Sequence, residues 1–149
     1  MSAIVSSATQ YCTFYLDGQY FGVDVQRVQE VLRHQTLTPV PLAAGTVRGL
    51  INLRGQIVTA LDLRQRLGMP ERTSDKPPMN IVIRSDDEAV ALLVDEIGEV
   101  VDVEEGRFER PPETLQGPAR ELIPGAYKLD DRLLLILDTD KAISPQYGS

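Results

Sequence analysis

The segment "VRGLINLRGQIVTALDLRQRLG", residues 47–68, decides how this chain can fold. Two apolar runs flank Arg54-Gly55, and Asp62 precedes a short basic stretch. A phosphate-binding loop needs several glycines whose N–H groups converge and lead into the N-terminus of a helix. Here the turn offers one glycine and leads into an apolar, strand-like run, so the segment predicts a β-hairpin that turns at Arg54-Gly55. Asp62 is then expected to cap a short helix that ends before Gly68.

The same order of elements recurs in residues 123–143, "IPGAYKLDDRLLLILDTDKAI". Four identical pairs are related by a shift of 76 positions: Gly49 and Gly125, Leu53 and Leu129, Leu61 and Leu137, Asp62 and Asp138. The blocks that precede these segments match at a shift of 69: Val25 and Val94, Val28 and Ile97, Glu30 and Glu99, Val31 and Val100. A proline-containing connection separates the two blocks in each half. The pattern indicates a tandem duplication of a unit of about 60 residues.

Each unit is expected to be mostly strand, with tight turns at Asp17-Gly18, residues 85–89, Arg54-Gly55 and Asp130-Asp131. Short strands in this number and spacing suggest a small barrel. Neither unit alone buries much apolar surface, so the two are expected to pack together. The predicted fold is therefore all-β with a few short helices. We place the first barrel at 11–68, a connector at 69–78 and the second barrel at 79–144.

The helices are predicted to be short. Asp24 is expected to cap a helix over residues 25–32, because Val25, Val28, Val31 and Leu32 would fall on one face. Asp138 is expected to cap a helix over residues 139–143 in the same way.

Composition limits what the protein can bind. In its 149 residues, 22 acidic side chains exceed 15 basic ones, and the net charge of −7 argues against a nucleic-acid partner. A membrane-surface role is disfavoured for the same reason. The single cysteine, Cys12, forms no internal disulfide and is expected to be buried, and the single histidine, His34, leaves no partner for a zinc site. No signal peptide or bilayer-spanning run is visible, so we expect a cytoplasmic protein without membrane insertion, metal or cofactor.

The residues in which the two copies differ are the candidates for function. Gly49 and Asp62 are matched in the second copy, so they are assigned to the fold, whereas Arg54 is not matched. Arg54 is either a contact for a partner or a solvated turn residue, and it could pair with Glu30 if the first helix packs beside the hairpin. The side chains of Val28 and Val31 lie either in the hydrophobic core or at an interface with a partner.

These features favour a binding module. A small-ligand or oligonucleotide binder and a hydrolase or transferase remain alternatives, but the chain has no Trp, few aromatic residues and no visible pairing of a nucleophile with a base.

Several motifs together resemble the signature of CheW, the coupling-protein family of bacterial chemotaxis. They are "FGVDVQRVQEV", "TPVP" and "VRGLINLRGQIVTALDLRQRLG" in the first half, with "VALLVDEIGEVVDV", "RPPE" and "GAYKLDDRLLLILDTDKAI" in the second. The resemblance covers about residues 11–144. The segment "TPVPLAAG" departs from many relatives, which carry a charged residue there.

The resemblance implies two SH3-like, five-stranded β-barrels and no enzymatic activity. It implies an adaptor that joins the cytoplasmic tip of methyl-accepting chemoreceptors to the regulatory domain of the histidine kinase CheA, in a membrane-associated array. An adaptor of a non-flagellar chemosensory pathway, such as pilus motility, is the alternative. Carried over by motif, the receptor-binding residues are Val28, Glu30, Val31 and Arg54, and Gly49 marks the contact with the kinase.

Overall fold

A computed structural model describes residues 8–33, 35–40, 47–71, 76–85 and 88–143. In this part of the chain the structure is mostly β, as predicted, with three short α-helices. The strands are β1 (Ala8–Leu16), β2 (Gln19–Asp24), β3 (Val28–Leu32), β4 (Val47–Leu53), β5 (Gln56–Asp62), β6 (Met79–Ser85), β7 (Glu88–Val94), β8 (Glu96–Glu104), β9 (Phe108–Glu109), β10 (Gly125–Lys128) and β11 (Leu133–Ile136). The helices are α1 (Leu63–Arg66), α2 (Pro118–Leu122) and α3 (Thr139–Ile143), with single 3-10 turns η1 (Val25–Arg27) and η2 (Glu105–Arg107).

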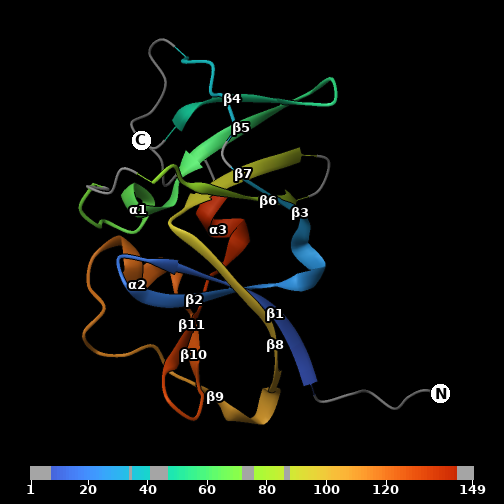
Figure 1. The fold of residues 1–149 in the computed structure, drawn as a ribbon. Helices are drawn as coiled ribbons and strands as arrows, with labels where there is room; N and C mark the ends of the chain where they lie inside the picture. Colours follow the sequence, from blue (N-terminus) through green and yellow to red (C-terminus); the bar gives the residue numbers. More distant parts are fainter. Residues whose placement is uncertain (1–7, 34, 41–46, 72–75, 86–87, 144–149) are drawn as a thin grey trace, which may run out of the picture.

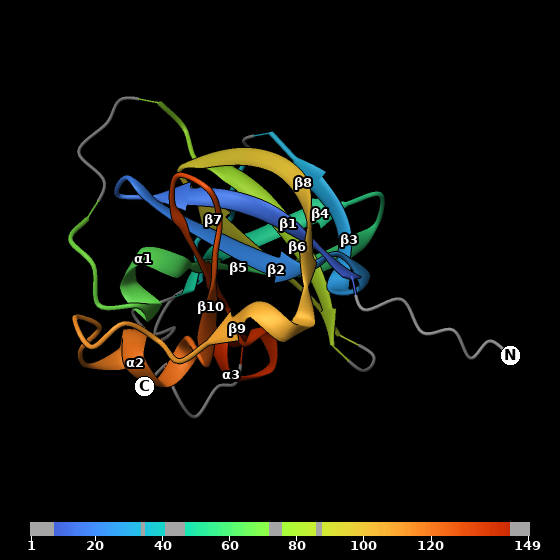
Figure 2. The ribbon, with the colours of Figure 1, turned by 90° about the horizontal axis from the view of Figure 1, so that it is seen from below.

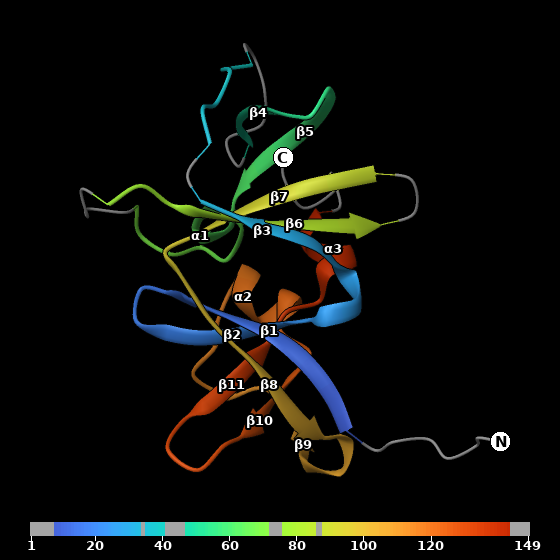
Figure 3. The same cartoon turned by 45° about the vertical axis from the view of Figure 1, so that its right-hand side comes forward.

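The strands form two sheets, which lie one above the other in Figures 1 and 3 with α2 and α3 in the layer between them. One sheet has six strands in the order β8-β1-β2-β11-β10-β9, and the other has five in the order β3-β6-β7-β5-β4. Most neighbours are antiparallel, but β2 runs parallel to β11 and β5 runs parallel to β7.

Each sheet takes strands from both halves of the sequence. The first hairpin, β1–β2, pairs with β8 and β11 of the second half, and the hairpin β6–β7 pairs with β3 and β5 of the first half. The predicted connector at 69–78 leads from β5 to β6, two strands of the same sheet. The predicted division of the chain at this connector therefore does not separate the two sheets.

The registers of the exchanged strands confirm the duplication. In the parallel pairs, Leu135 lies opposite Phe21 and Thr59 lies opposite Val90. These two pairs are related by the sequence shifts of 76 and 69. The antiparallel pair of Phe14 with Ile97 corresponds in the same way to the pair of Ile83 with Val28. Corresponding segments therefore make corresponding contacts in the two sheets.

The prediction of a helix over residues 25–32 is wrong. Asp24 does cap a turn, because its Oδ1 accepts a hydrogen bond of 2.9 Å from the Gln26 N–H, but this turn is the single 3-10 turn η1. The chain then continues as β3, in which partly buried and exposed residues alternate. The spacing of the apolar residues in this segment fits both the period of a helix and the period of a strand. The antiparallel partner β6 decides for the strand, because it supplies backbone hydrogen bonds that a helix here would forgo.

The predicted caps at Asp62 and Asp138 and the turn at Arg54-Gly55 are present, whereas the turn predicted at residues 85–89 lies partly outside the described residues. Asp62 Oδ1 accepts from the Gln65 N–H at the start of α1 (3.3 Å), and Asp138 Oδ1 accepts from the Lys141 N–H at the start of α3 (3.1 Å). At the tip of the β4–β5 hairpin, Arg54 and Gly55 have φ values of 51° and 90°, the left-handed conformation that a tight hairpin turn requires.

The main core lies between the two sheets. It joins alternate side chains of both sheets to apolar residues of all three helices: Phe14, Leu16, Phe21, Ile81, Ile83, Leu92, Leu63, Leu122 and Ala142 are among its members. Cys12 belongs to it, as the sequence predicted. Two smaller clusters lie on the faces of the sheets that point away from the main core. One contains Ile51, Val58 and Val82, and the other contains Tyr11, Tyr127 and Leu134. Each sheet is thus buried on both faces over part of its length.

Candidate functional site

The tip of the β4–β5 hairpin lies beside strand β3. Arg54 is held at this tip by the turn, in which Asn52 Oδ1 accepts a 2.9 Å hydrogen bond from the Gly55 N–H. The Arg54 guanidinium donates from Nη2 to Glu30 Oε2 and forms an ion pair with it. The pairing that the sequence allowed is therefore present, although Glu30 lies on a strand and not on a helix. The Glu30 side chain is 21% exposed and that of Arg54 is 72% exposed, so the carboxylate anchors a cation that faces solvent.

The two valines predicted beside Glu30 have different environments. Val31 is 38% exposed on β3. Val28 is partly buried and packs against the main core. The structure therefore places Val31 and Arg54 on the surface, while Val28 mainly connects β3 to the core.

Gly49 has a structural role on β4. Its φ of +153° is rare for residues with a side chain, and a Cβ built on it would lie 2.7 Å from the Thr38 carbonyl oxygen and 3.2 Å from Leu37 Cβ. Thr38 and Leu50 exchange two backbone hydrogen bonds of 2.8 and 2.9 Å beside it. Gly49 is buried and offers a partner no side chain, so any effect on binding passes through the segment 35–40 that lies over it.

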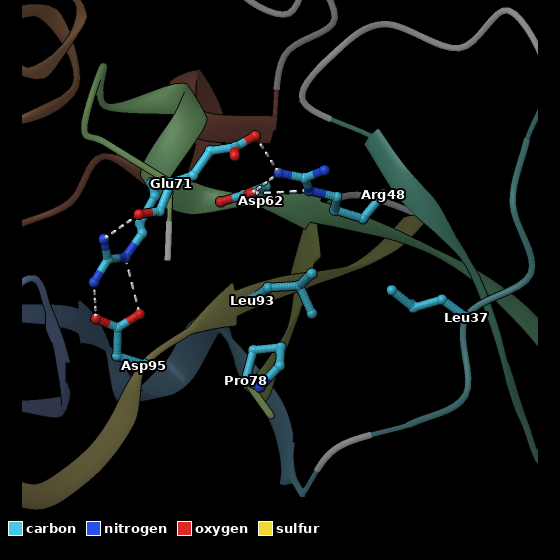
Figure 4. Close-up of a pocket in the computed structure, with 8 residues that line it drawn as sticks. Leu37, Arg48, Asp62, Glu71, Pro78, Leu93 and Asp95 are labelled. Carbon is cyan, nitrogen blue, oxygen red and sulfur yellow. Dashed lines mark hydrogen bonds and ion pairs between the residues drawn. The ribbon is translucent and has the colours of Figure 1, made fainter. Parts of the chain in front are cut away.

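A pocket of about 300 Å³ near this segment is bordered by two arginines and three carboxylates. Figure 4 shows Arg48 beside Asp62, whose Oδ2 accepts hydrogen bonds of 2.9 Å from Arg48 Nε and 2.7 Å from Nη2. Across the pocket, Arg64 donates from Nε to Asp95 Oδ1 (3.0 Å) and from Nη2 to Asp95 Oδ2 (2.5 Å). The hydrogen bonds that Arg64 donates to Asp95 raise the pKa of its guanidinium, which therefore stays charged at any ordinary pH. Because both cations are paired, the pocket is not an anion site.

Arg66, the last arginine of the quoted segment, is only 3% exposed. It donates from Nε to the Ala142 carbonyl and from Nη2 to the Lys141 carbonyl, both at 2.7 Å. Arg48, Arg54, Arg64 and Arg66 therefore each fix a different contact. The segment serves as a set of connections and not as a catalytic loop.

The described residues contain no group of three or more His, Cys, Asp or Glu side chains placed to hold a metal ion. His34 lies outside the described residues. Within the same part of the chain, no helix has the length and apolar character needed to cross a bilayer.

A family model for the CheW-like domain matches residues 10–146. The chain belongs to this family. A protein named "Chemotaxis protein CheW" from Bacillus subtilis is 30% identical over 146 residues, which span 98% of this chain and 94% of that protein. The protein of the same name from Thermotoga maritima is 32% identical over 133 residues, 88% of this chain and 85% of that protein. The crystal structure of the scaffolding protein TtCheW from Thermoanaerobacter tengcongensis matches with a TM-score of 0.78 and 29% identity, covering 87% of this chain and 88% of that one.

These findings confirm the resemblance and support a scaffold or adaptor function in chemotaxis for this CheW-like chain. Sequence reasoning missed the roles of Asp95 and Arg66. A usable signal was present, because each of them is a charged residue whose counterpart in the other half is uncharged: Gln26 and Ala142. The same criterion had singled out only residues of the β4–β5 hairpin.

Proposed function

We propose that the protein is a non-enzymatic chemotaxis adaptor that couples chemoreceptors to the histidine kinase CheA in a signalling array on the cytoplasmic side of the membrane. The observation that carries this proposal is the Glu30–Arg54 ion pair, which holds an exposed, oriented guanidinium at the tip of the β4–β5 hairpin in a CheW-like fold.

The receptor is proposed to bind around Glu30, Val31 and Arg54, with the partly buried Val28 holding strand β3 in place below them. An exposed ion pair contributes only about 0–1 kcal/mol to stability. Its stronger effect is on recognition, because Glu30 fixes the direction of the Arg54 guanidinium before a partner arrives. Val31, the next residue along β3, is exposed on the other face of the strand and would add apolar contact area there.

The kinase is proposed to bind beside Gly49, through the segment 35–40. Gly49 allows this segment to approach β4 closely, and the exposed Val40 lies on it. A change at Gly49 would then weaken kinase binding by displacing the segment, without removing any side chain that the kinase touches.

The test is a charge reversal at Arg54. Calorimetric titration of the full chain is carried out against a receptor cytoplasmic fragment and, separately, against the CheA regulatory domain. Arg54→Glu is expected to weaken receptor binding by at least about tenfold, which is about 1.4 kcal/mol, and to leave kinase binding within about twofold. The double variant Glu30→Arg with Arg54→Glu restores an ion pair but reverses its orientation, so it should fold normally and still bind the receptor poorly.

Arg120→Glu is the matched control, because Arg120 is an exposed arginine on α2 and the charge change is the same. It should leave both affinities unchanged. Unchanged receptor binding by Arg54→Glu would remove the role of Arg54, and failure of the unmodified protein to bind any kinase regulatory domain would overturn the adaptor proposal.

A further inference from the structure

A second arginine is held in place at the surface of the six-stranded sheet. The Arg132 guanidinium carbon lies 3.9 Å from the centre of the Tyr20 ring and 5.9 Å from that of Tyr15. Arg132 Nη1 also donates a 2.6 Å hydrogen bond to the Tyr15 hydroxyl oxygen. The two rings are 5.1 Å apart at their centres and tilted by 37°. The tyrosines lie on β1 and β2, which run side by side in Figure 2. Arg132 directly precedes β11, which pairs with β2.

The charge of Arg132 is not neutralised by a hydrogen-bonded carboxylate among the described residues. The carboxylate oxygen of its chain neighbour Asp131 lies 3.7 Å from Nε, too far for a hydrogen bond. Arg27, Arg48, Arg54 and Arg64, in contrast, all donate to carboxylates. A guanidinium carries five N–H donors in one plane, so Arg132 keeps most of its donors while aromatic contacts restrict its position.

This arginine borders a pocket of about 520 Å³, a volume within the usual range of binding pockets. Of the described residues that line the pocket, Arg132 is the single charged one, although the whole chain carries a net charge of −7. Pro112, Thr114 and Leu115 also line the pocket. Leu133 and Leu135 add apolar surface beside the tyrosines. The lining thus combines one cation with apolar and aromatic walls.

We propose that this pocket binds a partner polypeptide through an Asp or Glu side chain, which pairs with Arg132 while an apolar neighbour of that side chain packs against the Pro112–Leu115 wall. A planar carboxylate matches the planar donor edge of a guanidinium, and aromatic contacts reduce the entropy lost when the pair forms. A peptide fits better than a small free carboxylate because the Arg132 side chain is 43% exposed, so that a small ligand would remain largely in water.

The inference is independent of the proposed receptor surface, because Glu30 and Arg54 belong to the five-stranded sheet. It is tested by NMR on the full chain, using the Arg132 Nε–H and the rings of Tyr15 and Tyr20 as reporters. The probes are acetyl-Leu-Glu-Leu-amide, its Gln analogue, N-acetylglutamate amide and inorganic phosphate. The Glu tripeptide is expected to shift all three reporters with an affinity of about 1 mM, and the Gln analogue should shift none of them.

Arg132→Gln is expected to abolish binding of the Glu tripeptide, and Tyr15→Phe should weaken it by about threefold because the guanidinium loses one of its anchors. Arg120→Gln, at an exposed arginine on α2, is the control and should bind normally. Each variant is checked for a dispersed native spectrum. Absence of shifts would overturn the proposal. So would equal affinity for N-acetylglutamate amide, which would indicate a site for free carboxylates, or tighter binding of phosphate.

Discussion

The hairpins β4–β5 and β10–β11 occupy corresponding places in the two sheets but carry different chemistry at their tips. In the first, Arg54 binds Glu30 of β3. The residues that correspond to this pair in the second are Asp130 and Glu99, which are both acidic and cannot form an ion pair. The arginine of the second hairpin lies two residues further along and packs against two tyrosines. Duplication therefore preserved the backbone and left the tips free to acquire different partners.

A second difference lies where the two corresponding short helices meet. Helices α1 and α3 correspond to each other, and residue 66 of one matches residue 142 of the other. Arg66 reaches across and donates to the carbonyls of Lys141 and Ala142, in the last turn of α3. The final carbonyls of a helix lack partners within the helix and carry its partial negative charge, so a cation there is doubly favourable. Ala142 has no side chain that could return this contact.

Replacement of Arg66 by Leu should therefore have the largest effect on stability. The change leaves two carbonyls without their buried donor, and each such loss costs about 1–3 kcal/mol. We expect the free energy of unfolding, measured in urea, to fall by about 3 kcal/mol. Arg120→Leu, on the exposed face of α2, should change it by less than about 0.5 kcal/mol. A loss at Arg66 as small as that of the control would show that the contact between Arg66 and α3 is not required.

The matched glycines should give the next largest effect. A Cβ at Gly49 would lie 2.7 Å from the Thr38 carbonyl oxygen, and a Cβ at Gly125 would lie 2.5 Å from the Glu109 carbonyl oxygen. Each Gly→Ala change forces a backbone segment away from the sheet, at about 2 kcal/mol. Gly106→Ala is the control, because nothing lies within 4 Å of its Cβ position. Thermal or urea unfolding checks all three, and native stability of Gly49→Ala would contradict the close approach.

The two glycine variants also test the proposed kinase surface. Gly49→Ala and Gly125→Ala should cost similar stability but act on opposite ends of the molecule. If only Gly49→Ala weakens binding of the CheA regulatory domain in calorimetry, general destabilisation is excluded as the cause. Equal binding by both variants would place the kinase contact away from segment 35–40.

Local pattern was sufficient for the hairpins, turns and caps of the fold, because each is decided by a few neighbouring residues. The exchange of β1–β2 and β6–β7 between the sheets could not be predicted in this way. Two similar hairpins can pair with either half, and the choice depends on packing across the whole molecule. The helix predicted over residues 25–32 was wrong for a related reason. Its valines fit both helix and strand, and the deciding partner, β6, is about 50 residues away in the sequence.

The contacts of the candidate site differ in the same way: some join residues of one half of the chain, and others join the two halves. From the sequence, Glu30 and Arg54 were expected to pair only if a helix over residues 25–32 packed beside the hairpin; the pair is present, although strand β3 stands in place of that helix. Asp95 escaped notice since its partner Arg64 comes from the other half, although the two charges meet at 2.5 Å. Neither contact could be read from the duplication, because the counterparts of Glu30 and Arg54 are both acidic and the Arg64–Asp95 contact depends on how the two copies assemble.

The smallest effect is expected at Cys12, whose counterpart in the other half is Ile81. Both are buried in the main core, so Cys12→Val should change the free energy of unfolding by less than about 1.5 kcal/mol at pH 7.5. Burial raises the pKa of the Cys12 thiol. The unfolded chain therefore ionises first, and the thiol's contribution to stability is complete below about pH 8.5 and declines as the pH rises toward the folded-state pKa. Urea unfolding at pH 7.5 and 9.5 should show a smaller loss of stability for the valine variant than for the natural sequence. Equal losses, or rapid labelling of the folded protein by a thiol reagent, would mean that position 12 is less enclosed than Ile81 and that the two halves of the core are not equivalent there.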